Sequence, residues 1–148
     1  MRISRFQSID MPRVLEIEQA CFPEEAYPEE LFAEYARKSP ELFLVARREG
    51  RVVGYGIAVV SGRSAELISI AVDPQHRRRR VGQALLDAAL RGISRAGGNT
   101  CRLAVRATNA EAICFYERNG FERVKLIRGY YGDGGDAIAM KRAFAGSG

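Results

Sequence analysis

The segment from Ala65 to Val105 constrains the fold more than any other part of the sequence. It begins with the apolar run "AELISIAV", typical of a strand, which ends at an Asp-Pro pair and is followed by four consecutive arginines, Arg77–Arg80. A Leu-rich helical pattern follows at Gly82–Arg95, and Thr100–Val105 predicts another strand. Strand, helix and strand in this order predict a parallel crossover unit, with both strands in one sheet and the helix on one face.

The rest of the chain adds further elements to this unit. Those predicted before it are a strand at Arg2–Gln7, helices after Asp10 and at Pro28–Lys38, and strands at Leu42–Arg47 and Val52–Val60. Those predicted after it are a helix at Ala110–Arg118 and strands at Phe121–Arg128 and Ala137–Arg142. This order predicts a mixed α/β fold, in which a mixed sheet has helices on both faces. We expect one domain over residues 1–144 and a disordered tail at 145–148.

The composition is that of a globular protein that needs neither disulfides nor metals. Its 148 residues can bury a substantial core, and no apolar stretch is long enough to span a membrane. The three cysteines, Cys21, Cys101 and Cys114, form no C-x-x-C pair. This pattern favours reduced thiols in a cytoplasmic protein and gives no indication of a metal site. We expect Cys114 to be a buried structural thiol rather than an acyl carrier.

The arginine run predicts an anion site. It precedes a predicted helix, whose first N–H groups are unpaired and whose dipole is positive at that end. The formal net charge of +5 and the pI near 9.4 also favour an anionic partner. A solvated basic loop is the alternative for such a run. A nucleic-acid interface is disfavoured because no aromatic residue adjoins the arginines. We therefore expect a phosphorylated small ligand here.

Three ordered segments resemble the GNAT N-acetyltransferases. Arg77–Gly82 is similar to the family's R/Q-x-x-G-x-G/A loop, and "VRATNAEAICFYERNGFE" to its N-x-x-A-x-x-F-Y-x-x-x-G-F segment. "RGYYGDGGDAIAMKR" resembles the C-terminal hairpin of the RimI-like branch, which acetylates protein N-termini. The resemblance implies the GNAT fold, with a central mixed sheet splayed near its middle and helices on both faces.

The resemblance implies acetyl-CoA as cosubstrate and no metal. It assigns the oxyanion and pantetheine contacts to backbone groups of Ile70, Ala71 and Val72. It assigns the pyrophosphate and nearby contacts to Arg77, Arg78, Arg79, Arg80, Val81, Gly82, Gln83, Asn109 and Tyr116. One position departs from the family pattern, because Arg80 stands where the first glycine of the loop is expected. A side chain there must adopt a backbone geometry that glycine tolerates more easily.

The resemblance also assigns the chemistry of amine acetylation. Tyr116 is the expected acid that protonates the leaving thiolate; the alternative is a tyrosine at the edge of the core. RimI-type enzymes carry a basic glutamate in an L-E-V-R pattern, but this chain has Ala104 there, which cannot accept a proton. We expect Glu66 to replace it, because "AELISIAV" resembles the strand that carries the base in related histone acetyltransferases. Strand alternation places Glu66 among the apolar residues Ile68, Ile70 and Val72. The alternative is an exposed glutamate at the start of the strand.

The acceptor is expected to be a protein N-terminal α-amine, with a ribosomal protein beginning with alanine as the first candidate by resemblance. Tyr130 and Tyr131 resemble the paired tyrosines that bind a peptide N-terminus, and the candidates on the opposite wall are Glu24, Glu25 and Tyr27. A lysine side chain or small amine is the alternative acceptor. A CoA-binding protein without turnover is a second alternative, suggested by Ala104 and by the arginine in the loop. His76 lies within the loop, where we expect a surface role.

Overall fold

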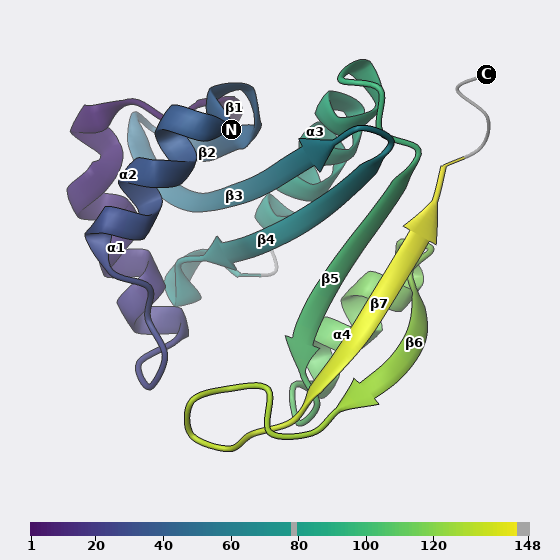
Figure 1. The fold of residues 1–148 in the computed structure, drawn as a ribbon. Helices are drawn as coiled ribbons and strands as arrows, with labels where there is room; N and C mark the ends of the chain where they lie inside the picture. The colour runs from purple at the N-terminus through teal and green to yellow at the C-terminus, as the bar shows by residue number, and fades with distance from the viewer. Residues whose placement is uncertain (78–79, 145–148) are drawn as a thin grey trace.

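A seven-stranded sheet forms the centre of the computed structural model, which describes residues 1–77 and 80–144 (Figure 1). The strands are β1 (Arg2–Arg5), β2 (Phe43–Arg48), β3 (Arg51–Ser61), β4 (Ser64–Val72), β5 (Thr100–Arg106), β6 (Glu122–Ile127) and β7 (Ala137–Ala143). The predictions for Arg78, Arg79 and the tail at 145–148 lie outside the described residues.

The sheet is mixed, as the sequence predicts. Its strand order is β1-β2-β3-β4-β5-β7-β6. Strands β4 and β5 are parallel, and a crossover through the helix at Val81–Arg95 joins them. The other neighbouring strands are antiparallel. The crossover unit predicted from Ala65 to Val105 is therefore confirmed.

Strands β4 and β5 pair only at their beginnings. The ladder joins Ser64–Glu66 to Thr100–Arg102, and beyond it the two strands diverge, so that the sheet opens into a V (Figure 1). Past this point, the edge of β4 that faces β5 has no ladder partner. The Val72 carbonyl accepts a hydrogen bond from Sγ of Cys21 at 3.2 Å, and backbone groups without a ladder partner can bind a ligand. The predicted splay of the GNAT fold is present at this junction.

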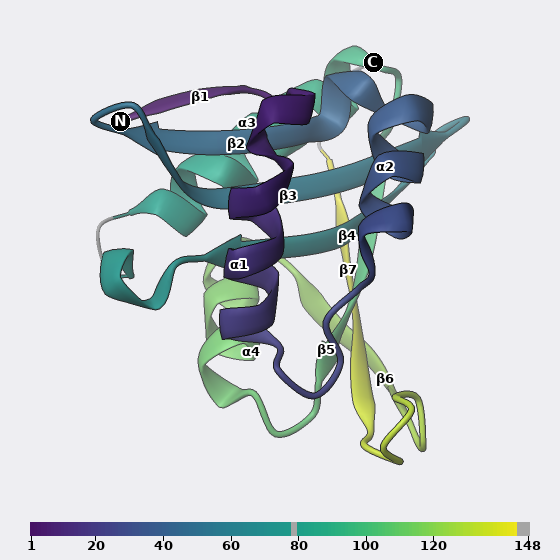
Figure 2. The same ribbon diagram turned by 90° about the vertical axis from the view of Figure 1, so that its left-hand side faces the viewer.

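Two pairs of helices cover the two faces of the sheet (Figure 2). Helices α1 (Met11–Cys21) and α2 (Glu29–Lys38) pack on one face, around Val14, Ile17 and Phe32. Helices α3 (Val81–Arg95) and α4 (Ala110–Arg118) pack on the other. The apolar residues of α3 recur at helical spacing, which places them all on its sheet-facing side: Val81, Leu85, Leu86, Ala89 and Ile93.

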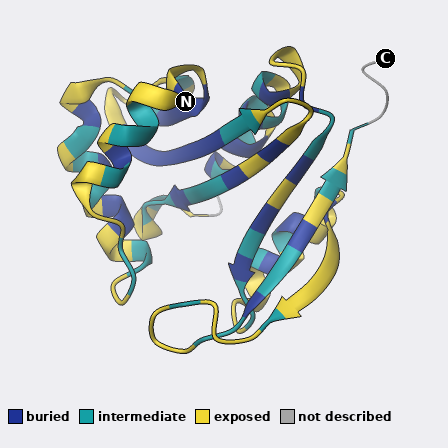
Figure 3. Cartoon of the chain, viewed as in Figure 1, coloured by how far each residue is buried: buried dark blue, intermediate teal, exposed yellow. Residues whose placement is uncertain are grey.

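Burial follows these layers (Figure 3). The strands at the centre of the sheet are largely buried, whereas the edge strand β6 is exposed along most of its length. Short 3₁₀ turns at Ser8–Asp10, Pro40–Leu42 and Pro74–His76 complete the elements. In the described part of the chain, no helix is both long enough and apolar enough to cross a membrane.

A β-bulge in β4 overturns one prediction about its side chains. The pairing with β3 shifts between Ile57 and Ala58, which leaves β4 with one extra residue, Ile68. A bulge moves the side chains that follow it to the opposite face. Ile68 therefore packs against the core under α1 and α2, whereas Ile70 packs against the core under α3 and α4. The prediction of one shared face is wrong for this set: Glu66, Ile68, Ile70 and Val72.

Close packing between α3 and the sheet depends on Gly54 of β3. A Cβ at this position would lie 3.0 Å from the carbonyl oxygen of Ala71 and 3.0 Å from Cγ1 of Val81. We expect Gly54→Ala to lower the free energy of unfolding by about 1–3 kcal/mol, because the added methyl overpacks this contact. Chemical denaturation measures the change.

Gly56 is the matched control on the same strand. A Cβ there would meet its nearest neighbour, Cγ1 of Ile70, at 3.6 Å, an ordinary van der Waals distance. Gly56→Ala is expected to be neutral or to stabilise the protein by about 0.5–1 kcal/mol, since glycine inside a strand carries an entropic cost. Equal losses in the two variants would contradict the packing argument.

Candidate active site

Two adjoining cavities lie where the sheet opens. The first, here called the loop cavity, has a volume of about 800 Å³ and lies between the α1–α2 loop and the β6–β7 loop. The second, here called the arginine cavity, has a volume of about 680 Å³ and lies at the beginning of α3. Both are lined by Cys21, Phe22, Ile70, Asn109, Ala112 and Tyr116. The shared lining makes one continuous site.

The arginine cavity contains the described residues expected to bind the cofactor. Its lining includes Ile70, Ala71, Val72, Arg77, Arg80, Val81, Gly82, Gln83, Asn109 and Tyr116. Among the described residues, no side chain caps the beginning of α3, and the first helical hydrogen bond runs from the Ala84 N–H to the Arg80 carbonyl. The N–H groups of the first turn are therefore available to an anion.

Two further observations fit a phosphate-bearing cofactor in this cavity. His76 lines it, and its Nδ1 atom is buried without a hydrogen-bond partner among the described residues. Arg118, at the end of α4, adds another guanidinium to the lining. Three arginines near the beginning of a helix are donors suited to a pyrophosphate, and a buried histidine nitrogen without a partner in the described part of the chain lies beside them.

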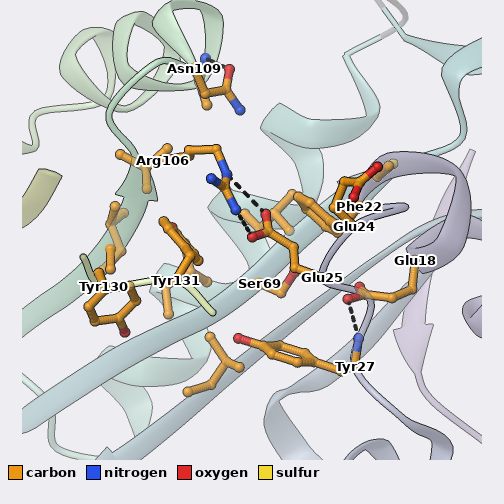
Figure 4. Close-up of a pocket in the computed structure, with 18 of the residues that line it drawn as sticks. Glu18, Phe22, Glu24, Glu25, Tyr27, Ser69, Arg106, Asn109, Tyr130 and Tyr131 are labelled. Atoms are coloured by element: carbon orange, nitrogen blue, oxygen red, sulfur yellow. Dashed lines mark hydrogen bonds and ion pairs between the residues drawn. The ribbon is translucent and has the colours of Figure 1, made fainter. Parts of the chain in front are cut away.

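The α1–α2 loop and the β6–β7 loop are joined across the loop cavity by one arginine (Figure 4). Arg106, at the end of β5, forms an ion pair with Glu25, and its Nη1 lies 3.2 Å from Oδ1 of Asp133. Its guanidinium also stacks on Tyr131, 4.2 Å from the ring centroid. This arrangement holds both loops against β5. Burial, followed by the negative charge of Glu25, raises the pKa of Tyr131 to about 12.

A buried carboxylate lies at the α1 side of the loop cavity. Glu18 is only 2% exposed, and it accepts a hydrogen bond from the Tyr55 hydroxyl. It also accepts one, at 2.9 Å, from the backbone N–H of Tyr27 (Figure 4). Burial raises the pKa of Glu18, although the two hydrogen bonds oppose the shift. The α1–α2 loop is therefore tied to a carboxylate that binds a proton more readily than an ordinary glutamate does.

Tyr116 lies at the junction of the two cavities. Its ring packs edge-on against Phe115 and Phe121, with centroid distances of 5.2 and 5.6 Å. Burial raises the pKa of Tyr116, so the hydroxyl remains protonated near neutral pH. The expected acid is thus placed between the cavity with the cofactor residues and the cavity with the loop residues.

The loop cavity also contains the five residues expected to bind the acceptor: Glu24, Glu25, Tyr27, Tyr130 and Tyr131. Glu66 is the exception among the predicted site residues that the structure describes. It is exposed, lies in the short segment where β4 still pairs with β5, and lines neither cavity. The apolar surroundings expected for it are absent, because β4 carries it before the strands diverge.

Comparison with known proteins identifies the family. A family model described as "Acetyltransferase (GNAT) family" matches residues 11–121. The chain belongs to the GNAT acetyltransferase family. It is an acetyl-CoA-dependent N-acetyltransferase, and the lining of the arginine cavity suits that cosubstrate.

The chain is similar over nearly its whole length to enzymes named for N-terminal acetylation. It is 32% identical over 152 residues to the N-alpha-acetyltransferase of Sulfurisphaera tokodaii, covering 94% of this chain and 90% of that one. It is 36% identical over 131 residues to the ribosomal protein bS18-alanine N-acetyltransferase of Escherichia coli, covering 87% and 86%. The crystal structure of Ard1 from Thermoplasma volcanium matches with a TM-score of 0.92 at 35% identity, covering 97% of each chain.

Sequence reasoning missed several residues of the site. Glu18 could have been found, because it falls on the apolar stripe of α1 with Val14 and Ile17, where an unpaired carboxylate is unusual. The ion pairs of Arg106 join three distant segments and leave no local signal. Cys114 is exposed, not buried as expected, because α4 turns Ile113 and Tyr116 toward the core.

Arg80 retains the backbone geometry of the glycine that the GNAT loop pattern expects. Its φ is 62° and its ψ is 18°, in the left-handed region that a Cβ disfavours. We expect Arg80→Gly to be more stable than Arg80→Ala by about 1 kcal/mol, because both lose the guanidinium and only alanine retains the strain. Urea denaturation without acetyl-CoA measures the difference. Equal stabilities would show that Arg80 carries no strain.

Proposed function

We propose that the acceptor is the α-amine of a protein N-terminus and that it binds in the loop cavity. The observation that carries this proposal is that the two cavities meet at Tyr116. The loop cavity, which is lined by carboxylates and tyrosines, therefore adjoins the arginine cavity. A positively charged amine is attracted to such a cavity, and tyrosines provide both apolar surface and hydroxyl groups for a peptide. The names of the relatives from Sulfurisphaera tokodaii and Escherichia coli support the same acceptor class.

The residues of the chain have separate tasks in this reaction. Acetyl-CoA supplies the acetyl group as a thioester. The first turn of α3 with Arg77 and Arg80 holds the phosphates, and the free edge of β4 at Ile70–Val72 provides N–H groups where charge develops on the carbonyl oxygen. Tyr116 donates its hydroxyl proton to the departing sulfur. Glu24 and Tyr27 on one wall, with Tyr130 and Tyr131 across the cavity, position the peptide.

The base is not found at either position considered from the sequence. Ala104 lines the loop cavity but has no proton-accepting group, and Glu66 lies outside the cavity. The carboxylates that do line it are Glu18, Glu24, Glu25 and Asp133. The α-ammonium group of a peptide therefore meets several candidate acceptors, of which only Glu18 is buried.

Two peptides test the acceptor. One begins with a free alanine and lacks lysine, and the other is blocked at its N-terminus and contains lysine. We expect acetylation of the free α-amine at a rate at least about tenfold higher than that of the lysine, as mass spectrometry will show. A bS18-like N-terminal sequence is the first ribosomal candidate. Transfer to lysine alone would identify a side-chain acetyltransferase, and CoA binding without any transfer would identify a degenerate member of the family.

Tyr116→Phe tests the proton donor. The hydroxyl of Tyr116 has no hydrogen-bond partner among residues 1–77 and 80–144, so its removal should change the free energy of unfolding by less than about 1 kcal/mol. We expect kcat to fall by about 10²-fold or more, since a positioned acid contributes on that scale. Steady-state kinetics and calorimetric titration with acetyl-CoA separate turnover from binding. An unchanged kcat would exclude Tyr116 as the acid.

A further inference from the structure

A chain of polar groups connects Ser69, on the β4 wall of the loop cavity, to Glu18 on its α1 side. Ser69 lines the cavity on β4, and its Oγ lies 3.5 Å from the hydroxyl of Tyr55 on β3. The Tyr55 hydroxyl in turn donates to Oε1 of Glu18. Tyr55 is fully buried, and Glu18 is nearly so. Two rotatable hydroxyl groups thus connect the cavity wall to a buried carboxylate.

The surroundings of Glu18 favour proton uptake. No lysine or arginine in the described part of the chain forms an ion pair with it. The titratable groups near it are Tyr55 on β3 and Tyr27 and Glu25 of the α1–α2 loop, and Tyr55 also lies near Cys21. Burial and the negative charge of Glu25 both favour the protonated carboxyl. Burial also raises the pKa of Tyr55, so this hydroxyl can pass a proton on but does not remain ionised.

The other carboxylates of the cavity are less suited to this task. Glu25 is held by Arg106, and Asp133 is held by the same guanidinium. Glu24 is exposed to solvent. A base that works near neutral pH needs a proton affinity above that of a solvated carboxylate, and burial without a cation provides it.

We propose that Glu18 is the proton acceptor of the transfer reaction and that Tyr55 and Ser69 connect it to the acceptor amine; this inference rests on the proposed function. As one N–H bond of the ammonium group breaks, Ser69 takes that proton and releases its own to Tyr55, which releases its own to Oε1 of Glu18. Both hydroxyls end with one proton each, and Glu18 later returns its proton to solvent. The second proton lost by the nitrogen replaces the one that Tyr116 gives to sulfur.

Glu18→Gln tests the proposal through the pH dependence of kcat/KM for the free-alanine peptide. At about pH 6.5 the α-amine is mostly protonated, because its ordinary pKa is about 7.7–8.0. We expect the variant to be slower there by about 10²–10⁴-fold, the scale of a general base. At about pH 9 the amine is already neutral, so the deficit should shrink at least about tenfold. A merely structural role predicts the same deficit at both pH values, and that result would overturn the proposal.

Two further variants sharpen this test. Tyr55→Phe keeps the buried ring but breaks the connection, and it should show the same pH-dependent deficit with unchanged acetyl-CoA binding. Glu16→Gln is the matched control, because Glu16 lies on the same helix with a side chain 66% exposed and, in the described part of the chain, forms an ion pair only with Arg13. It should retain wild-type kinetics. If Glu18→Gln does not fold, Tyr55→Phe decides, and a pH-independent deficit in it would overturn the proposal.

Stability provides a readout that does not depend on catalysis. Because burial raises the pKa of Glu18, the folded state holds this proton more tightly than the unfolded state does. Protonated Glu18 contributes its full stabilisation at pH values below the ordinary pKa of glutamate. This contribution is lost as the pH rises through the raised pKa that Glu18 has in the folded state. Glu18→Gln should therefore become more stable relative to wild type between about pH 4 and 8. A constant difference would overturn the proposal by showing an ordinary, solvated carboxylate.

Failure of this inference is distinguishable from failure of the proposed function. If wild-type enzyme acetylates no free peptide N-terminus, the acceptor assignment itself is wrong. If wild type is active and the Glu18→Gln deficit does not depend on pH, the acceptor assignment stands and Glu18 has no part in proton transfer.

Discussion

The divergence of β4 from β5 is the constraint on which the rest of the site depends. The two parallel strands share a ladder only at Ser64–Glu66 and Thr100–Arg102, and both cavities lie beyond its end. A sheet can remain open in this way only if packing on its faces holds the diverging strands in place. On the face covered by α3 and α4, one apolar core extends from β2–β4 to β5 and β7. Helices α1 and α2 cover the β1–β4 half, and α4 packs beside β5–β7, while α3 contacts β3 and β4 (Figures 1 and 2). The free backbone edge is thus a property of the fold.

At the open end of the V, ion pairs rather than backbone hydrogen bonds connect the two halves of the sheet. Arg106 extends from β5 to Glu25, which belongs to a loop that follows α1, and also to Asp133 of the β6–β7 loop. Glu18 holds the same α1–α2 loop from the other side through the backbone N–H of Tyr27. The loops around the proposed acceptor site are therefore positioned by partly exposed ion pairs, which permit local movement, and by one buried carboxylate, which fixes the base of the α1–α2 loop.

The sequence predicts the order of the elements and most of the residues at the cavities, because both leave local signals. Helical periodicity predicts α3, and the arginine run with the following helix predicts an anion site, which stays a prediction. The sequence does not predict on which face of β4 each side chain lies, because one bulge at Ile68 reverses the alternation of side chains between the two faces. For this reason Ile70 and Val72 do not share a face with Glu66, and Glu66 itself lies before the point where β4 and β5 diverge. The ion pairs of Arg106 join chain segments up to 81 residues apart, so no local sequence pattern predicts them.

Two departures from the family pattern show which properties of the site are fixed by backbone and which by side chains. At Arg80 the loop keeps the left-handed backbone although the glycine is absent, since the turn into α3 requires that geometry. At Ala104 the expected carboxylate is absent, and the backbone cannot compensate for a missing proton acceptor. A buried carboxylate on α1 faces the same cavity from the opposite half of the sheet. Because a proton can reach it through hydroxyl groups, the base need not occupy the same strand for the same reaction to proceed.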